Sequence, residues 1–270
     1  MSLHFFEHGA QRLQEIVQPG MLCAFDFDGT LAPIVKDPHR ASVPSAVLRR
    51  MTILSELARV AIISGRSVAD VGVRLDFLPE FVIGNHGIEG LPGWEEKASR
   101  FQALCAGWEQ QLRHAMTDRT LFDGGIWIEN KTYSVSVHYR LARNRLDAES
   151  RLLDLFSALA PAARVVPGKC VFNLLPVDAP DKGTALAQLC VASGAPGAIY
   201  VGDDVTDEHV FTMRRRDWLT VRIERSGDSA ADFYIHHRLD MVQLLDALIG
   251  QLASFKAPSW RQSEQTVMTR

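Results

Sequence analysis

Short apolar runs alternate with amphipathic segments over the first 90 residues of the chain. The runs "MLCAFDF", "RVAIISG" and "EFVIGNHG" are almost continuously hydrophobic, which is typical of strands buried on both faces. Between them, residues 42–58 and 67–78 carry apolar side chains at helical spacing, and Ser45 is a candidate N-cap of the first of these helices. This alternation predicts a parallel sheet covered by helices on both faces.

The pattern changes in the middle of the chain and then returns. Residues 93–116 and 145–160 have the periodicity of long helices, whereas 124–140 and 164–176 each divide into two short strand-like runs. From residue 182 the strand and helix alternation resumes, with strands at 198–204 and 218–224, helices at 184–194 and 207–216, and a closing helix at 238–252. We therefore predict a doubly wound α/β core, residues 1–89 and 179–270, with an α+β domain, residues 90–178, inserted in it.

Composition and charge narrow the classes of function. The chain is 47% hydrophobic and 23% charged, with a formal net charge of −3, so there is no broad basic field to attract nucleic acid or an anionic membrane. No apolar stretch approaches the roughly 20 residues that span a bilayer, and the first residues do not have the pattern of a signal peptide. The four cysteines are far apart and form no CxxC pair. We expect a soluble, cytoplasmic protein with reduced thiols.

Polar residues follow each predicted core strand or open the helix after the insertion. The segments are "DFDGTL", "SGR", "DKG" and "GDDVTDE". Each has an ordinary interpretation on its own, such as an Asx turn, a surface lysine or an acidic first turn of a helix. In an open parallel sheet, however, ligands bind at the carboxyl ends of the strands. The topology thus predicts that these segments meet, bringing together Asp26, Asp28, Ser64, Lys182, Asp203, Asp204 and Asp207.

A cluster of carboxylates needs a cation. Two unit charges about 4 Å apart repel by about 4 kcal/mol at an effective dielectric constant of 20. The ligands are hard oxygens without a neighbouring histidine or cysteine cluster, which favours Mg²⁺ over zinc. A lysine and a serine hydroxyl beside such a metal suit the oxygens of a phosphoryl group. The sequence therefore predicts a magnesium and phosphate site.

The four segments, in this order, resemble the four motifs of the haloacid dehalogenase-like superfamily, and the insertion resembles its cap domain. Longer stretches are similar to trehalose-6-phosphate phosphatases, namely "DGTLAPI", "AIISGR", "GNHGIE", "ENKTYSVSVHYR" and "YVGDDVTDEHVF". The resemblance extends from about residue 22 to about residue 240. It implies Mg²⁺-dependent hydrolysis of trehalose 6-phosphate to trehalose and phosphate, and a functional link to a trehalose-6-phosphate synthase.

The resemblance also implies roles for single residues. Asp26 would be the nucleophile and Asp28 the general acid and base. Ser64 and Lys182 would hold phosphoryl oxygens. Mg²⁺ would be bound by Asp26, by the backbone carbonyl of Asp28 and by Asp203, while Asp204 and Asp207 would hold metal-bound water or Lys182; their two roles are not separated.

The inserted domain is expected to select the substrate. Strand alternation places Ser134, Ser136, His138 and Arg140 on one face of the strand, where they could contact a polyhydroxylated ligand or be an ordinary solvated face. The resemblance marks a wider set for phosphate-loop, sugar or hinge contacts: Thr30, Gly65, Arg66, His86, Glu89, Glu129, Lys131, His138, Arg140, Lys169 and Asn173. Asn173 departs from the family pattern, in which a glutamate is expected, so the specificity for the disaccharide is in doubt.

Other functions stay open at this point. A phosphatase of another sugar phosphate, such as sucrose phosphate or mannosylphosphoglycerate, would share the core chemistry and differ in the inserted domain. A phosphomutase would have to protect its phosphoenzyme from water. A catalytically silent sensor, or a regulatory partner of a synthase, would be expected to lack a nucleophile or a metal carboxylate, and here these residues are present.

Overall fold

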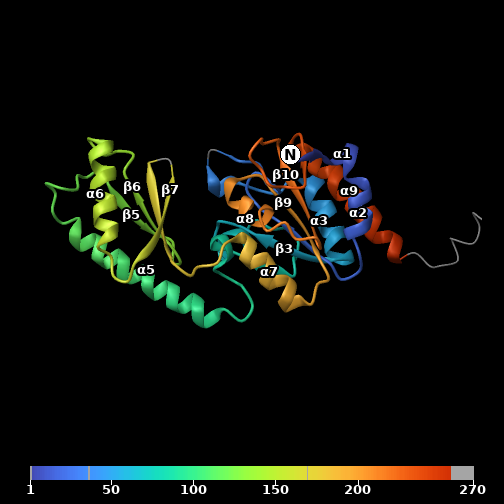
Figure 1. Cartoon of the computed structure of the whole chain (residues 1–270), viewed down its shortest axis with the longest axis horizontal. Helices are drawn as coiled ribbons and strands as arrows, with labels where there is room; N and C mark the ends of the chain where they lie inside the picture. Colours follow the sequence, from blue (N-terminus) through green and yellow to red (C-terminus); the bar gives the residue numbers. More distant parts are fainter. Residues whose placement is uncertain (1, 36, 169, 257–270) are drawn as a thin grey trace, which may run out of the picture. The chain divides into compact units, whose positions relative to one another are not determined.

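The computed structural model describes residues 2–35, 37–168 and 170–256, and the chain divides into two compact units (Figure 1). The first unit comprises Met1–His86 and Asp181–Arg270, and the second comprises Gly87–Pro180. The predicted fold class is confirmed: the first unit is a parallel α/β sandwich and the second an antiparallel sheet with helices. The boundaries differ by a few residues from the expected insertion at 90–178.

The sheet of the first unit has the order β1-β11-β10-β9-β2-β3-β4, and all its strands are parallel. Its strands are β1 (Leu3–His4), β2 (Leu22–Phe25), β3 (Arg59–Ile63), β4 (Phe81–Ile83), β9 (Ala198–Gly202), β10 (Trp218–Ile223) and β11 (Phe233–Ile235). β2 lies between β3 and β9, so the three strand ends that carry the predicted site residues are neighbours. The pattern did not predict β1 and β11, which span only two and three residues.

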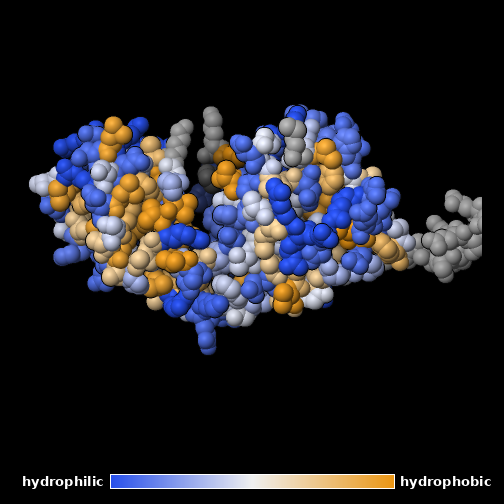
Figure 2. Space-filling model, viewed as in Figure 1, coloured by the Kyte–Doolittle hydropathy of each residue, from blue (hydrophilic) through white to orange (hydrophobic). Residues whose placement is uncertain are grey.

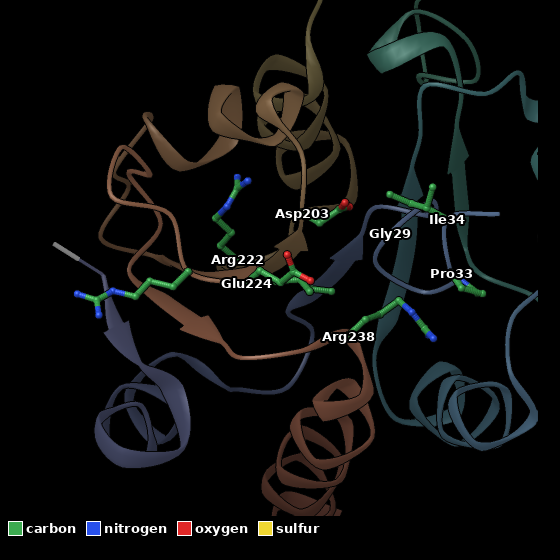
Figure 3. A pocket seen from close by; sticks show the side chains of 9 residues that line it. Gly29, Pro33, Ile34, Asp203, Arg222, Glu224 and Arg238 are labelled. Atoms are coloured by element: carbon green, nitrogen blue, oxygen red, sulfur yellow. The ribbon is translucent and has the colours of Figure 1, made fainter. Parts of the chain in front are cut away.

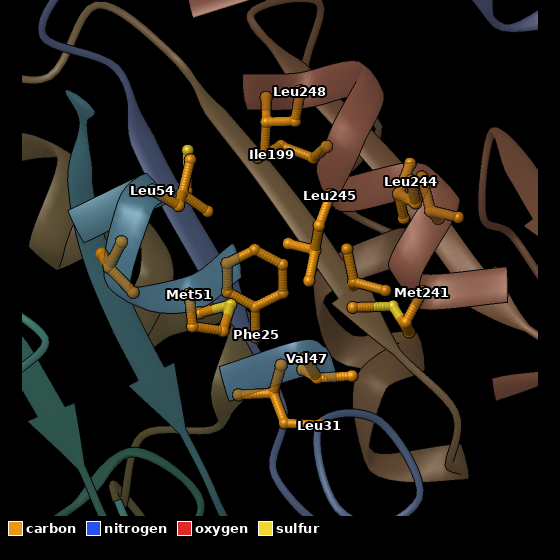
Figure 4. Close-up of a cluster of buried hydrophobic side chains, with 14 of the residues drawn as sticks. Phe25, Leu31, Val47, Met51, Leu54, Ile199, Met241, Leu244, Leu245 and Leu248 are labelled. Atoms are coloured by element: carbon orange, nitrogen blue, oxygen red, sulfur yellow. The ribbon is translucent and has the colours of Figure 1, made fainter. Parts of the chain in front are cut away.

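Helices cover both faces of this sheet. They are α1 (Phe5–His8), α2 (Ala10–Ile16), α3 (Ser45–Leu57), α4 (Val68–Gly72), α7 (Lys182–Ser193), α8 (Glu208–Phe211) and α9 (Met241–Lys256). On one face, α3 and α9 pack together over β2 and β9, where Phe25 and Ile199 meet Met51 and Leu245 (Figure 4). On the other face, the Tyr200 ring lies 6.0 Å from Phe211 of α8, and α8 packs on α7. The buried strands thereby hold their carboxyl ends in fixed positions.

Some helix predictions were wrong in detail. The helix expected over residues 67–78 ends at Gly72, a residue with low helix propensity, and the helix expected over 207–216 ends at Phe211. Beyond Phe211, Arg214 has a φ of +46°, which no right-handed helix allows. Ser45 begins α3 as its first helical residue, and Pro44 occupies the N-cap position instead.

The second unit is a four-stranded antiparallel sheet in the order β5-β6-β8-β7. Its elements are α5 (Glu95–Ala115), β5 (Trp127–Asn130), β6 (Val135–His138), α6 (Arg145–Ser157), β7 (Ala163–Gly168) and β8 (Val171–Pro176). Val135, Val137 and Leu174 point into a core that contains Trp108 of α5 and Leu152 of α6. The alternate positions of these strands form the opposite face of the sheet.

No helix in the described part of the chain is both long and apolar enough to cross a membrane. Figure 2 shows hydrophilic residues spread over the viewed face of each unit, with hydrophobic residues between them. The four cysteines all lie in the described part and are free thiols.

Candidate active site

The ends of three adjacent strands and the start of α7 bring four predicted segments together. Asp26 follows β2, Ser64 follows β3 and Asp203 follows β9, while Lys182 is the first residue of α7. The backbone N–H of Asp26 donates to the carbonyl of Val201 at 2.9 Å, which fixes the Asp26 loop against β9. The site is therefore built from the rigid edge of the sheet.

A buried ion-pair cluster lies at the centre of the site. The Lys182 Nζ donates to Asp26 Oδ1 at 2.8 Å and to Asp207 Oδ1 at 2.7 Å, and all three side chains are buried. Burial alone would lower the pKa of Lys182, but attraction by Asp26 and Asp207 outweighs it and raises that pKa. Lys182 is thus a permanent positive charge next to Asp26.

Asp207 is held by four donors. Besides Lys182, the Tyr200 hydroxyl donates to its Oδ1 at 2.6 Å, and the backbone N–H groups of Asp203 and Asp204 each donate to its Oδ2 at 2.9 Å. These contacts fix both Lys182 and the loop that carries Asp203. Asp207 therefore serves Lys182 and the loop backbone, one of the two roles left open for it and Asp204.

Asp26 and Asp203 are carboxylates with perturbed titration. Burial, opposed by Lys182, raises the pKa of Asp26 to about 7, and burial together with the charge of Asp207 raises the pKa of Asp203 to about 6.

The Asp203 carboxylate is also in contact with the loop after β2. Thr30 Oγ1 donates to Asp203 Oδ1 at 3.1 Å. Gly29 has a φ of +83°, and a Cβ there would lie 2.0 Å from the Asp203 carboxylate, so only glycine fits. The single positive charge of Lys182 does not balance the negative charges of Asp26, Asp203 and Asp207.

The carboxylates fit a hard divalent cation. One ligand oxygen each of Asp26, Asp203 and Asp207 lies within 4.8 Å of the others. Because the oxygens of Asp207 already accept from four donors, Asp26 and Asp203 are the better candidates to bind Mg²⁺. Asp204 is exposed and, among the described residues, lies outside this group.

Asp28 makes a bidentate ion pair with Arg66. The Arg66 Nε donates to Asp28 Oδ2 at 2.5 Å and the Arg66 Nη2 donates to Asp28 Oδ1 at 2.7 Å. Hydrogen bonding to Asp28 raises the pKa of Arg66. The sequence marked Arg66 for substrate contact; the structure places its guanidinium on the second aspartate of the "DFDGT" motif.

The turn that carries Ser64 is held by two residues after β4. The His86 N–H donates to the Ser64 carbonyl at 2.9 Å, and the Asn85 N–H donates to the Arg66 carbonyl at 2.7 Å. Ser64 itself is buried, and its Oγ accepts from the Arg66 N–H at 3.2 Å. A Cβ at Gly65 would lie 2.5 Å from the His86 ring. Gly65 and His86 thus shape the turn around Ser64.

A pocket of about 310 Å³ adjoins Asp203 (Figure 3). It lies where the loop after β2 meets the ends of β9, β10 and β11, and Arg222 on its wall pairs with Glu208 at 3.0 Å. Its lining residues are Gly29, Pro33, Ile34, Asp203, Arg222, Ile223, Glu224, Arg225 and Arg238. Sequence reasoning missed most of them because it selected the residues of the four motifs and of the stretches that resemble the family. For Arg238, β11 is too short to reveal that this residue follows a strand of the same sheet.

The second unit places several predicted residues on the sheet face opposite its core. His138 Nε2 lies 2.9 Å from Glu129 Oε2, and the Lys131 Nζ lies 3.6 Å from the same carboxylate oxygen. Ser136 Oγ donates to the Asn173 side-chain oxygen at 2.7 Å. Strand pairing places Glu129, Ser136 and Asn173 in one row across the sheet, and Ser136 is buried within it. We call Glu129, Lys131, Ser136, His138 and Asn173 the polar face.

The other marked residues lie apart from this face or outside the described chain. Arg140 is exposed beyond the end of β6, and Glu89 is in the loop before α5, where its charge adds to burial in raising the pKa of Tyr133. Lys169 lies outside the described residues.

Trp127 belongs to the polar face and was missed by sequence reasoning. Its ring is stacked on His138, with centroids 3.8 Å apart and planes 9° apart, and 49% of the residue is exposed. The missed signal was the strand period of two, since Trp127 and Glu129 alternate with Ile126 and Ile128, which pack in or against the core of this unit.

Comparisons with known proteins agree with this geometry. A family model described as Trehalose-phosphatase matches residues 24–233. A trehalose-phosphate phosphatase of Mycobacterium ulcerans (strain Agy99) is 30% identical over 241 residues, 85% of this chain and 62% of that protein. A probable trehalose-phosphate phosphatase H of Arabidopsis thaliana is 27% identical over 252 residues, 83% of this chain and 70% of that protein. The chain spans less than two thirds of the mycobacterial relative.

The fold also has a solved counterpart. The crystal structure of a trehalose-6-phosphate phosphatase related protein is similar with a TM-score of 0.67 and 24% identity, over 87% of this chain and 100% of that chain. This likeness supports the fold assignment.

Proposed function

We propose, because this chain belongs to the trehalose-phosphatase family, that it hydrolyses trehalose 6-phosphate to trehalose and inorganic phosphate. The observation that carries the proposal is the buried cluster in which Lys182 binds Asp26 and Asp207 beside Asp203. Such a cluster suits a doubly negative phosphate ester, since it offers a nucleophile, a fixed positive charge and a site for a cation.

In the first step, Asp26 attacks phosphorus. Lys182 binds its Oδ1, so we assign the attack to Oδ2. The bond between phosphorus and the sugar oxygen breaks, and Asp28 protonates the leaving oxygen, giving an aspartyl phosphate and free sugar. Ser64 and Lys182 are assigned to the phosphoryl oxygens.

In the second step, Asp28 takes a proton from water, which attacks the phosphorus of the aspartyl phosphate. Inorganic phosphate leaves and the Asp26 carboxylate is restored. Mg²⁺, held by Asp26, Asp203 and the backbone carbonyl of Asp28, would supply positive charge that offsets the phosphoryl oxygens when it is bound. Asp207 keeps Lys182 and the Asp203 loop in place through both steps.

We assign sugar recognition to the polar face of the second unit. Glu129, Lys131 and His138 offer hydrogen-bonding groups to hydroxyls, and the half-exposed Trp127 ring offers a flat apolar surface to a sugar ring. Asn173, bound to Ser136, is neutral at the position where the resemblance led us to expect a glutamate. This one departure favours the alternative of a different sugar phosphate as substrate.

Phosphate release from a panel of sugar phosphates tests the proposal. With Mg²⁺ present, kcat/KM for trehalose 6-phosphate should exceed the values for glucose 6-phosphate and sucrose 6-phosphate. Equal values for all three would overturn the assignment of substrate and leave the phosphatase class intact.

Magnesium binding should strengthen with pH. Asp26 and Asp203, with pKa values of about 7 and about 6, must both lose their protons to bind the cation. In the metal-free protein, folding raises these two pKa values, and the protonated carboxyl groups therefore add to the free energy of unfolding. This contribution is complete below about pH 4 and is lost as the pH rises through 6 and 7. Mg²⁺ should therefore raise the Tm more at pH 8 than at pH 5.

A thermal melt with and without Mg²⁺ measures this difference at matched ionic strength. The Asp203→Asn variant is the control and should show a smaller shift at pH 8. A larger Mg²⁺ shift at pH 5 than at pH 8 would contradict the assignment of these carboxylates.

Restoring a glutamate at position 173 should change selectivity rather than chemistry. Asn173→Glu adds a charge on the polar face, and a new charge-assisted hydrogen bond to a sugar hydroxyl is worth about 1.5–3 kcal/mol. We expect about a 10-fold or greater change in the ratio of kcat/KM for trehalose 6-phosphate to that for glucose 6-phosphate. Leu146→Glu, which adds the same charge at an exposed position of α6, away from the polar face, is the matched control and should leave the ratio unchanged. An unchanged ratio would remove Asn173 from sugar recognition.

A further inference from the structure

The Arg66 side chain contacts three residues, namely Asp28, Asp70 and Phe27. Besides the bidentate bond to Asp28, its Nη1 donates to Asp70 Oδ2 at 2.6 Å, and its Cζ lies 5.6 Å from the centroid of the Phe27 ring. Its side chain is 13% exposed. A guanidinium with five donors and a fixed plane can hold a carboxylate in one orientation, which a lysine cannot.

The partner of Arg66 is itself held. The Arg74 Nη2 donates to Asp70 Oδ1 at 2.6 Å, and the Arg74 Nη1 donates to the backbone carbonyl of His39 at 2.6 Å. Ser67 caps α4 by accepting from the Asp70 N–H at 3.2 Å. A continuous chain of charge-assisted hydrogen bonds therefore runs from Asp28 through Arg66, Asp70 and Arg74 to the segment after β2.

We propose that Arg66 is a positioning residue for Asp28, and that Asp70 and Arg74 act through it. The inference rests on the proposed function, in which Asp28 transfers the proton. Each carboxylate oxygen has two lone pairs, so the bidentate bond leaves one position on each oxygen. In the first step this position carries the proton that Asp28 gives to the sugar oxygen, and in the second step its lone pair accepts a proton from water. Arg66 thereby sets the direction in which Asp28 meets the leaving group, and the substrate itself needs no contact with Arg66.

This role predicts a dependence on the leaving group. A sugar alkoxide is a poor leaving group and needs a proton as the bond to phosphorus breaks, whereas 4-nitrophenolate leaves without one. Misplacing a catalytic group by about 1 Å can cost about 100-fold in rate. Loss of Arg66 should therefore slow the first step far more for the sugar phosphate than for 4-nitrophenyl phosphate, whereas the second step, hydrolysis of the aspartyl phosphate, is the same for both.

The experiment compares Arg66→Gln, Arg66→Lys and Asp70→Asn with the unchanged chain on both substrates, with Mg²⁺. We expect the rate of sugar release from trehalose 6-phosphate in the first turnover to fall by about 100-fold in Arg66→Gln, with KM and the first-turnover release of 4-nitrophenolate changed by less than about 3-fold. Arg66→Lys should recover part of the loss, and Asp70→Asn should show a smaller loss in the same direction. Arg50→Gln, which removes a bidentate pair with Asp246, is the matched control.

A second comparison tests whether the effect of Arg66 depends on Asp28. In an Asp28→Asn background, Arg66→Gln should cause little additional loss, because its effect passes through Asp28. Equal losses on both substrates, a raised KM with unchanged kcat, or full additivity with Asp28→Asn would each overturn the inference. Failure of the unchanged chain to hydrolyse any sugar phosphate would instead overturn the proposed function.

Discussion

Replacing Asp26 with asparagine is expected to lower kcat by about 10⁴-fold or more, because an amide cannot form the aspartyl phosphate. The variant should still bind the substrate. Its amide keeps an oxygen for Lys182, and Asp207 holds that lysine independently through its own 2.7 Å contact. The expected result is thus a loss of turnover in a folded protein.

Phosphate release and equilibrium binding of trehalose 6-phosphate measure the two halves of this prediction. Asp217→Asn, at an exposed carboxylate paired with Arg215, is the matched control and should retain full activity. Activity of Asp26→Asn within 10-fold of that of the unchanged chain would contradict the covalent mechanism.

Replacing Asp207 with alanine is expected to cost about 3–5 kcal/mol of the free energy of unfolding. The change removes one of the two carboxylates that bind the buried Lys182, and it leaves the Tyr200 hydroxyl and two backbone N–H groups without their acceptor. The two backbone N–H groups belong to Asp203 and Asp204, so loss of their acceptor also loosens the loop that carries Asp203. We therefore expect Asp207→Ala to weaken Mg²⁺ binding as well as lower the free energy of unfolding.

Urea unfolding of the metal-free protein measures the stability change, and isothermal titration measures Mg²⁺ binding. Asp217→Ala is the control, since an exposed pair contributes about 0–1 kcal/mol. A loss below about 1 kcal/mol in Asp207→Ala would show that Asp207 does not support Lys182.

The sequence was sufficient for the parts of the fold that have strong periodicity. The continuous apolar runs of β2, β3 and β9 and the helical spacing of α3 and α5 predicted the core and the inserted unit. The elements that were missed or overextended are short: β1, β11, α4 and α8 span two to five residues. Such elements form because neighbouring strands and loops hold them, which a local pattern does not reveal.

The candidate site could likewise be predicted from the sequence only in part. Parallel strands meet at their carboxyl ends, so the convergence of Asp26, Lys182 and Asp203 could be predicted from the order of the elements. Which side chain pairs with which depends on rotamers and on burial. For that reason the sequence left the role of Asp207 open and marked Arg66 for the substrate, whereas its guanidinium lies on Asp28.

Rapid acid quenching during the first turnover tests the central claim most directly, using trehalose 6-phosphate labelled with ³²P. We expect label bound to protein, on the peptide that contains Asp26, before free phosphate appears. In Asp28→Asn the bound fraction should be larger with labelled 4-nitrophenyl phosphate, because the first step of this substrate needs no proton from Asp28 while attack by water is slowed. Release of labelled phosphate at the full rate, with no label on the protein at any time in either form, would contradict it.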